Sequence, residues 1–331
     1  MKLIIPMAGR GKRLRPQSSV TPKPLLSVAG TCMVERIVEG FRDVLPHPIT
    51  EGVFILSPGF GLDVRTKLTD ICTRHGMETH FVVQEEALGT AHAVAVTGDH
   101  LQGEGIVVYA DTVFQMMPGL ALEGADVVAW VKEVEDPSRF GVAVREGPRI
   151  VAFVEKPEEL ISNEALIGIY YVRDLSRLRQ AIDHLFTKDI RGKGGEYYLT
   201  DALDVMLNDG LEFRTAVVTA WLDCGTLDAL MDTTRYLLRS KQQTARDGVT
   251  NSILVEPVFI APGAVVTDSI LGPDVSVERD ARITSSIIRT SIVFEGAHVD
   301  HAVLENSFVG AHARIVKTAP SLNVGDFSTV Q

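Results

Sequence analysis

MAGRGKRLRPQSSVTPKP, residues 7–24, is the stretch of sequence from which the fold can be worked out. It follows the run Leu3-Ile4-Ile5, and a short apolar run leading into Gly-x-Gly predicts a buried strand that ends in a close-packed loop. The first 34 residues contain no Asp or Glu, although the whole chain has a net charge of -11. Their cations are Lys2, Arg10, Lys12, Arg13, Arg15 and Lys23. Glycine amides framed by Arg and Lys predict a phosphate-binding loop, the alternative being a solvated basic turn.

Two well-known phosphate loops do not fit this stretch. A dinucleotide-binding fingerprint needs a third glycine three residues after Gly11, where this chain has Leu14. A P-loop needs four residues between its glycines, but Arg10 alone separates Gly9 from Gly11. The loop is therefore of another kind.

The remaining pattern, G-x-G-x-R-L-x-P followed by T-P-K-P-L, resembles the sugar-1-phosphate nucleotidylyltransferases. These enzymes join a nucleoside triphosphate to a sugar 1-phosphate. The resemblance implies that the loop wraps the triphosphate, that Arg13 steadies its charge, and that Lys23 contacts the reacting groups. Lys12 stands where the family usually has a small hydroxyl residue. The nucleotide-binding residues implied in this loop are Ala8, Gly9, Gly11, Lys12 and Arg13.

The composition limits the class of protein. A chain of 331 residues with 45% apolar and 23% charged residues is long enough for two soluble domains. Its acidic balance argues against nucleic acid or an anionic membrane as a partner. No apolar window approaches the roughly 18 residues of a membrane span, and the N-terminus shows no signal-peptide pattern. Cys32, Cys72 and Cys224 fit neither a disulfide framework nor a zinc site, so we expect a cytoplasmic protein.

The first 240 residues predict an α/β catalytic domain with a Rossmann-like, open, mixed but mostly parallel sheet. Expected strands are 3–5, 53–56, 79–83, 106–109, 127–131, 141–144, 150–155, 166–172 and 213–218. Expected helices are 33–44, 62–75, 89–98, 176–186, 200–209 and 226–240. Ligands gather at the carboxyl ends of such strands, so Gln84 and Asp111 should face the same crevice as the glycine loop.

The pattern changes after a polar linker expected at 241–251. From 252 to 331, apolar residues recur every five or six positions, with turn-forming residues between them. That period predicts triangular coils stacked as a β-solenoid, whereas a small β-sandwich would alternate with period two. It resembles the left-handed parallel β-helix attached to many nucleotidylyltransferases. We expect this part to serve assembly or regulation and not chemistry, and we expect a homo-oligomer.

A second family-like segment runs from Gln84 to Ala91, QEEALGTA. A glutamine amide offers one donor and one acceptor in one plane, which suits the edge of a pyrimidine base. Gly89 would let the backbone approach the nucleoside. The resemblance implies that Gln84, Gly89 and Thr90 bind the nucleotide.

Two aspartates are candidate metal ligands. Asp111 follows an expected buried strand, and Asp223 lies in Trp221-Leu222-Asp223-Cys224-Gly225. Mg²⁺ takes few protein carboxylates and completes its shell with water and substrate phosphate. In the family the matching pair holds Mg²⁺ on the α-phosphate.

The sugar phosphate is expected to lie beside Val154-Glu155-Lys156-Pro157, because this segment resembles the family's signature for that ligand. A lysine ammonium at this strand end can pair with the phosphate. Glu196 is the expected acceptor for sugar hydroxyls. The complete implied set is Gly141, Glu155, Lys156, Gly168, Glu196 and Tyr198, together with Lys23.

The resemblance implies nucleotidyl transfer from a triphosphate to a sugar 1-phosphate, with glucose-1-phosphate thymidylyltransferase as the specific expectation. Alternatives in the family are a uridylyltransferase acting on glucose or N-acetylglucosamine 1-phosphate, and a mannose-1-phosphate guanylyltransferase. The preferred triphosphates are dTTP and UTP. Two other classes stay open. The solenoid could be an acyltransferase with His298, His301 or His312 as base, or the chain could be a non-catalytic sugar-nucleotide sensor.

Overall fold

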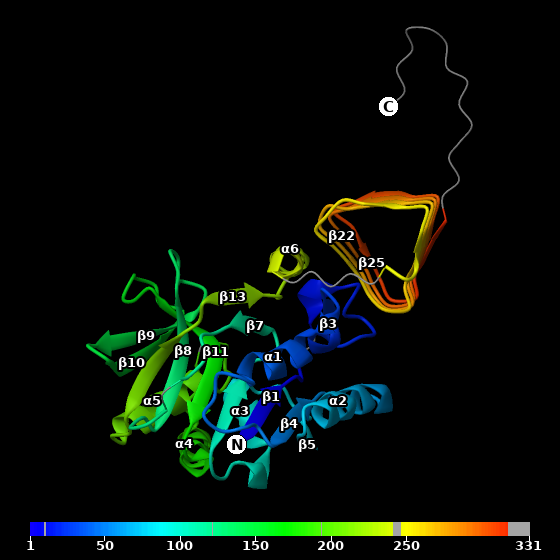
Figure 1. Ribbon diagram of the computed structural model, residues 1–331. Helices are drawn as coiled ribbons and strands as arrows, with labels where there is room; N and C mark the ends of the chain where they lie inside the picture. Colours follow the sequence, from blue (N-terminus) through cyan, green and yellow to red (C-terminus); the bar gives the residue numbers. More distant parts are fainter. Residues whose placement is uncertain (10, 121, 193, 241–245, 317–331) are drawn as a thin grey trace. The chain divides into compact units, whose positions relative to one another are not determined.

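The computed structural model describes residues 1–316 except positions 10, 121, 193 and 241–245, and leaves the Lys12 side chain undescribed (Figure 1). The chain forms two compact units. The first comprises Met1–Leu26 and Cys32–Thr226, and the second comprises Ser27–Thr31 and Leu227–Gln331. The last helix and residues 27–31 thus group with the solenoid, whereas the sequence pattern assigned both to residues 1–240. Part of the expected linker and the end of the expected solenoid lie outside the described residues.

The first unit contains a nine-stranded mixed sheet in the order β5-β4-β1-β6-β11-β8-β12-β10-β9 (Figure 1). Strands β5, β4, β1 and β6 are parallel, while β11 runs antiparallel to both β6 and β8. The strand bounds are β1 Lys2–Pro6, β4 Glu51–Leu56, β5 Glu78–Val83, β6 Gly105–Val108, β8 Val127–Glu133, β9 Gly141–Glu146, β10 Arg149–Glu155, β11 Glu164–Val172 and β12 Phe213–Val217. The Rossmann-like mixed sheet is confirmed.

Both faces of this sheet are covered, which explains why its central strands β1, β6 and β11 are largely apolar. Leu3 and Ile5 of β1 belong to one core, and Ile4 between them belongs to the other. Helices α1 (Met33–Phe41) and α2 (Leu62–Arg74) contribute to the first core. The second contains residues of α3 (Thr90–Ala95), α4 (Leu175–Lys188) and α5 (Leu199–Asn208).

One small sheet is absent from the sequence prediction. β7 (Thr112–Gln115) pairs antiparallel with β13 (Ala220–Asp223), and Asp223 lies opposite Thr112. The prediction also extended the preceding strand to Tyr109, whereas β6 ends at Val108. Tyr109 instead begins the turn that leads to β7. Within the described residues, no helix combines the length and apolar character that a membrane crossing requires.

The second unit contains α6 (Leu227–Ser240), residues 27–31 and a solenoid of triangular coils (Figure 1). Residues 27–31 carry most of a hairpin made of β2 (Ser27–Val28) and β3 (Thr31–Cys32), whose last residue, Cys32, belongs to the first unit. Three parallel sheets form the sides of the triangle. They are β14 Val249–Thr250, β17 Val265–Thr267, β20 Arg282–Thr284, β23 His298–Asp300 and β26 Arg314–Val316; β15 Ile253–Leu254, β18 Ile270–Leu271, β21 Ile287–Arg289 and β24 Val303–Glu305; and β16 Val258–Ile260, β19 Val275–Val277, β22 Ser291–Val293 and β25 Phe308–Val309.

The coil length follows from the strand register. Val266 pairs with Ile283, a step of 17 residues, and Ile283 pairs with Val299, a step of 16. Three sides per coil give the spacing of five or six that the sequence shows. A serine ladder supports one corner, because the Ser269 and Ser286 amides each donate to the hydroxyl of the serine one coil earlier, at 3.0 and 3.1 Å.

A buried carboxylate fixes the hairpin within the second unit. Glu278 is only 4% exposed and accepts hydrogen bonds from the Ser27 hydroxyl at 2.6 Å, the Gly30 amide at 3.2 Å and the Ser276 hydroxyl at 2.7 Å. Gly30 has φ 86°, and a Cβ there would lie 2.2 Å from the ring of Phe259. The contacts satisfy the buried charge and hold the hairpin against the solenoid.

Candidate functional site

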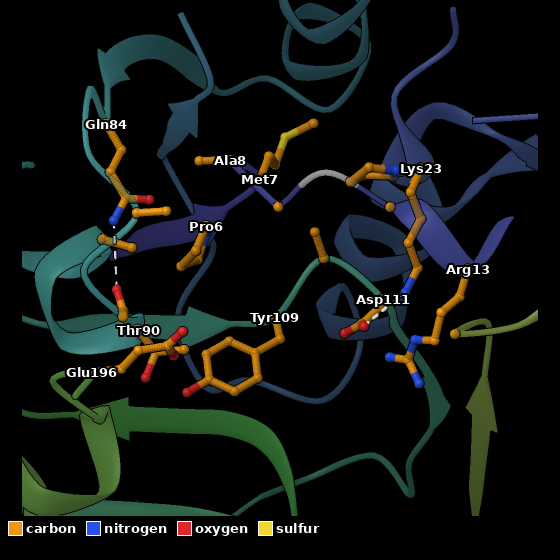
Figure 2. Close-up of a pocket in the computed structure, with 18 residues that line it drawn as sticks. Pro6, Met7, Ala8, Arg13, Lys23, Gln84, Thr90, Tyr109, Asp111 and Glu196 are labelled. Atoms are coloured by element: carbon orange, nitrogen blue, oxygen red, sulfur yellow. Dashed lines mark hydrogen bonds and ion pairs between the residues drawn. The ribbon is translucent and has the colours of Figure 1, made fainter. Parts of the chain in front are cut away.

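A cavity of about 470 Å³ lies where β1, β5 and β6 end (Figure 2). Met7 follows β1, Gln84 follows β5, and Tyr109 follows β6, so the cavity occupies the carboxyl edge of the sheet. The expected meeting of Gln84 and Asp111 with the glycine loop is confirmed. The predicted site residues that line the cavity are Ala8, Gly9, Gly11, Arg13, Lys23, Gln84, Gly89, Thr90, Asp111 and Glu196.

The glycine loop is folded back on itself by local hydrogen bonds. Gly11 has φ 54°, and its carbonyl accepts from the Leu14 amide at 3.0 Å and the Ser18 hydroxyl at 2.7 Å. A Cβ on Gly11 would lie 3.2 Å from the Cβ of Lys23. Glycine therefore permits both the left-handed backbone and the close approach of the lysine segment.

Lys23 and Asp111 form an ion pair inside the cavity. The Lys23 Nζ lies 2.7 Å from Asp111 Oδ2, and Figure 2 shows the two side chains pointing at each other beside Arg13. The Lys23 side chain is 11% exposed and the Asp111 side chain is 42% exposed. The sequence marked both residues as site residues but gave no sign of this pair.

The β7–β13 pairing brings the backbone of Asp223 within one residue of Asp111. Asp223 lies opposite Thr112, the residue after Asp111, and its Oδ1 accepts from the Gly225 amide at 2.8 Å. Gly225 lines the cavity, whereas Asp223 does not. Asp111 already holds one cation, the Lys23 ammonium, and carboxylate oxygens are ligands that Mg²⁺ takes in small number and completes with water and phosphate. The chemistry of these two carboxylates suits a divalent ion, and their assignment as its ligands stays a prediction.

Gln84 is held in one orientation. Its side chain is 6% exposed and lies at the cavity wall (Figure 2). Its Nε2 lies 3.0 Å from His92 Nδ1 and 3.5 Å from the Gly89 carbonyl. Burial lowers the pKa of His92, and a neutral imidazole nitrogen can accept from the glutamine amide. A fixed amide at the cavity wall can discriminate between ligands that donate and ligands that accept.

Gly89 has backbone angles that side chains do not tolerate, φ 114° and ψ 179°. A Cβ there would lie 2.4 Å from the Tyr197 carbonyl oxygen. The Tyr197 amide donates to the Leu88 carbonyl, and the Ala91 amide donates to the Tyr197 carbonyl, each at 2.9 Å. This close backbone pairing brings Thr90 and Glu196 to one side of the cavity (Figure 2).

Tyr109 lines the cavity but was not singled out from the sequence. Its ring occupies the space beside Gly168, where a Cβ would lie 2.4 Å away, and Gly168 has φ 77°. A Cβ on Gly141 would likewise lie 2.8 Å from Glu155 Oε2. Gly168 and Gly141 thus make room for the side chains of Tyr109 and Glu155. Burial raises the pKa of Tyr109, with Glu155 and Asp111 adding to the shift, so the phenol stays protonated.

The other residues assigned to the sugar phosphate lie together but do not line the cavity. Lys156 has φ 46°, and its Nζ lies 3.5 Å from Glu155 Oε1 and 5.7 Å from the ring centre of Tyr198. Its side chain is half exposed. Their assignment to the sugar phosphate stays a prediction. In the solenoid, the three candidate bases His298, His301 and His312 are exposed.

Comparisons with known proteins match both parts of the chain. The family model "Nucleotidyl transferase" matches residues 2–240, and "GlmU-like, C-terminal hexapeptide" matches residues 240–299. The second match agrees with the expected left-handed β-helix. Among curated proteins, the chain is 25% identical to a glucose-1-phosphate thymidylyltransferase of Streptomyces griseus, covering 100% of this chain and 99% of the relative.

Two further curated relatives and two solved structures extend the comparison. A low-salt glycan biosynthesis nucleotidyltransferase of Haloferax volcanii is 30% identical, over 77% of this chain and 71% of the relative. A bifunctional protein GlmU of Methanocaldococcus jannaschii is 28% identical, over 80% of this chain and 61% of the relative. A putative glucose-1-phosphate thymidylyltransferase structure from Bacillus anthracis superposes with a TM-score of 0.58 at 25% identity, covering 74% of this chain and 98% of that one. A UDP-glucose pyrophosphorylase complexed with UDP-glucose has the same fold at 19% identity, with a TM-score of 0.57 over 72% of this chain and 99% of that one.

Proposed function

Because this chain belongs to the nucleotidyl transferase family, we propose that it transfers a thymidylyl group from dTTP to glucose 1-phosphate and releases pyrophosphate. Sugar-1-phosphate nucleotidyl transfer, which generally uses a divalent metal, is the activity that the family and its named members share. The finer choice of thymidine and glucose follows the relatives that match the whole length of this chain.

One observation carries the proposal. A single cavity combines a cationic glycine loop, a buried amide and a carboxylate paired with a lysine. The loop amides and Arg13 suit a triphosphate, and Gln84 suits the edge of a base. A sensor would need the same binding groups, but it would not need a lysine and a carboxylate beside the phosphates.

The proposed reaction is an in-line displacement at the α-phosphorus. An oxygen of the sugar 1-phosphate forms the new P–O bond, the bond to the β-phosphate breaks, and pyrophosphate leaves with the electron pair. The attacking oxygen is already ionised at neutral pH, so no general base is needed, and catalysis rests on positioning and charge neutralisation.

Each charged residue would have a distinct part in this reaction. Arg13 would offset charge on the leaving pyrophosphate, and Lys23 would lie between the two substrates. Lys23 is held in the cavity by Asp111 before any substrate binds. Asp111 and Asp223 would hold Mg²⁺, which supplies further charge neutralisation when bound. Lys156 would hold the sugar phosphate, with Glu196 accepting from sugar hydroxyls.

The proposal is tested by a pyrophosphate-release screen of dTTP, UTP, GTP and ATP against glucose, N-acetylglucosamine and mannose 1-phosphates. The highest kcat/KM is expected for dTTP with glucose 1-phosphate. UTP is the nearest alternative, because a glutamine amide reads thymine and uracil alike. The highest kcat/KM with GTP and mannose 1-phosphate would instead indicate a mannose-1-phosphate guanylyltransferase. One relative, from rice, is named as a probable enzyme of that kind. No turnover with any pair would favour the sensor.

We also propose that this activity takes place in the cytoplasm. All three cysteines are free thiols, which suits the reducing cytoplasm where nucleoside triphosphates are available.

We propose that the solenoid serves assembly of a homo-oligomer, because every residue matched to the chemistry lies before position 227.

Gln84→Ala is expected to relax the choice of base more than it slows the best reaction. Removal of the amide abolishes the penalty for leaving a buried polar group unpaired against the wrong base, which is worth about 1–3 kcal/mol. The ratios of kcat/KM among the four triphosphates should therefore converge. Gln102→Ala, at an exposed position, is the matched control and should leave the ratios as they are. Unchanged ratios in Gln84→Ala would show that another residue reads the base.

A further inference from the structure

Glu51, His80 and His100 form a cluster of possible metal ligands at the edge of the sheet where β4 and β5 begin. The substrate cavity lies at the other end, where β1, β5 and β6 finish. The two places are therefore separated by the length of the strands, and the cluster takes no part in the proposed reaction.

The strand register explains why these side chains meet. Glu51 of β4 lies opposite Glu78 of β5, and His80 lies two residues beyond Glu78, so all three project from one face. His100 ends the short helix η3 (Gly98–His100), and its ring centre lies 4.6 Å from that of His80. The cluster therefore joins two strands to the segment that follows α3.

One ring nitrogen of His80, Nε2, has no hydrogen-bond partner within the described part of the chain. This nitrogen is screened from solvent and lies 3.6 Å from Glu51 Oε2 and 3.6 Å from Glu78 Oε1. The ligand atoms of Glu51, His80 and His100 all lie within 4.8 Å of one another. A screened imidazole nitrogen that lies near two carboxylates and makes no hydrogen bond is a position that a cation bound by the group would satisfy.

We propose that Glu51, His80 and His100 bind a divalent transition-metal ion of the Zn²⁺ class. Two imidazoles and a carboxylate are a typical ligand set for such ions, whereas Mg²⁺ favours oxygen ligands alone. Water or the more exposed Glu78 completes the four positions. Zinc bonds of about 2.0–2.2 Å place neighbouring ligand atoms roughly 3.3–3.5 Å apart, so the three side chains close in by rotation on binding.

One positive charge lies near the cluster, the ammonium of Lys2. Lys2 is the first residue of β1, and its Nζ donates a hydrogen bond to the Gln102 carbonyl at 2.8 Å. A metal in the cluster would cross-link β4, β5 and η3. Because η3 follows α3, whose first residue Thr90 lines the substrate cavity, the cross-link would anchor the far end of a segment that contributes to that cavity.

The experiment uses the full-length protein, free of any histidine tag, stripped with EDTA and dialysed against metal-free buffer. Zinc is titrated calorimetrically, and its stoichiometry is measured by mass spectrometry of the metal. Co²⁺ is used in parallel, because its visible absorption reports nitrogen and oxygen ligands in a tetrahedral site. We expect one Zn²⁺ per chain, and a higher Tm with zinc than without it.

His80→Gln and His100→Gln should each weaken zinc binding at least tenfold and abolish the zinc-dependent rise in Tm. The matched control is His184→Gln, at an exposed position of α4, which should bind zinc as the unaltered chain does. The two histidines lie in different elements, so either variant tests the site if the other fails to fold. Zinc binding of equal strength in both variants, or no saturable binding by the unaltered protein, overturns the proposal.

Discussion

Asp111→Asn and Asp223→Asn are each expected to lower kcat by two or more orders of magnitude, about 3 kcal/mol of transition-state stabilisation. Asparagine keeps the shape of the side chain but loses the charge that would hold Mg²⁺ against water. The loss is measured as pyrophosphate release at saturating Mg²⁺. Because both carboxylates would serve one ion, the double variant should be little worse than the poorer single variant. Triphosphate binding should persist in part through Arg13 and the loop amides.

The two variants should differ in stability. Asp111→Asn leaves the nearly buried Lys23 ammonium without its carboxylate, so the free energy of unfolding should fall by about 1 kcal/mol. Asp223 is exposed, and its replacement should leave Tm close to the starting value. Asp70→Asn, at an exposed position of α2, is the matched control for the loss of one negative charge. Near-normal turnover in either single variant would remove that residue from the metal site.

Gly89→Ala is expected to weaken triphosphate binding at least a hundredfold and to lower Tm. Its φ of 114° with ψ of 179° is a region open almost only to glycine, and the added methyl would lie 2.4 Å from the Tyr197 carbonyl oxygen. The backbone segments around Gly89 and Tyr197 must therefore move apart, which displaces Thr90 and Glu196 from the cavity wall. The combined strain and lost hydrogen bonds amount to about 3 kcal/mol, measurable by calorimetry and by denaturant unfolding.

Gly59→Ala provides the control for the added methyl group. A Cβ on Gly59 would meet nothing within 4 Å, and its φ is outside the left-handed region. The Gly59→Ala variant should bind the triphosphate with the same affinity as the unaltered protein and have the same Tm. If Gly89→Ala bound dTTP with normal affinity, the close pairing with Tyr197 would have no part in shaping the nucleotide site.

The sheet and the cavity could be predicted because their signals are local. Short apolar runs end at the glycine loop, at Gln84 and just before Asp111, and parallel strands bring their carboxyl ends together. The solenoid could be predicted equally well, since its period of five or six residues reflects one buried side chain per side of each coil.

The parts that could not be predicted depend on contacts between residues far apart in sequence. Lys23 and Asp111 are 88 positions apart, and β7 and β13 are short strands whose pairing leaves no periodic pattern. The position of Tyr109 at the cavity could have been inferred, because it stands between an expected strand and Asp111. Its packing against Gly168 could not, since that contact depends on the left-handed backbone of a distant strand.

The hairpin held by Glu278 bears on the order in which this chain can fold during synthesis. The polypeptide passes between the two units three times, after Leu26, after Thr31 and after Thr226. Ser27 leaves the ribosome 251 residues before the carboxylate that binds its hydroxyl. The segment between Lys23 and α1 must therefore wait until the chain has been made at least as far as Glu278, although the surrounding sheet can form earlier. We expect the last native contacts of the amino-terminal region to form only when synthesis is nearly complete.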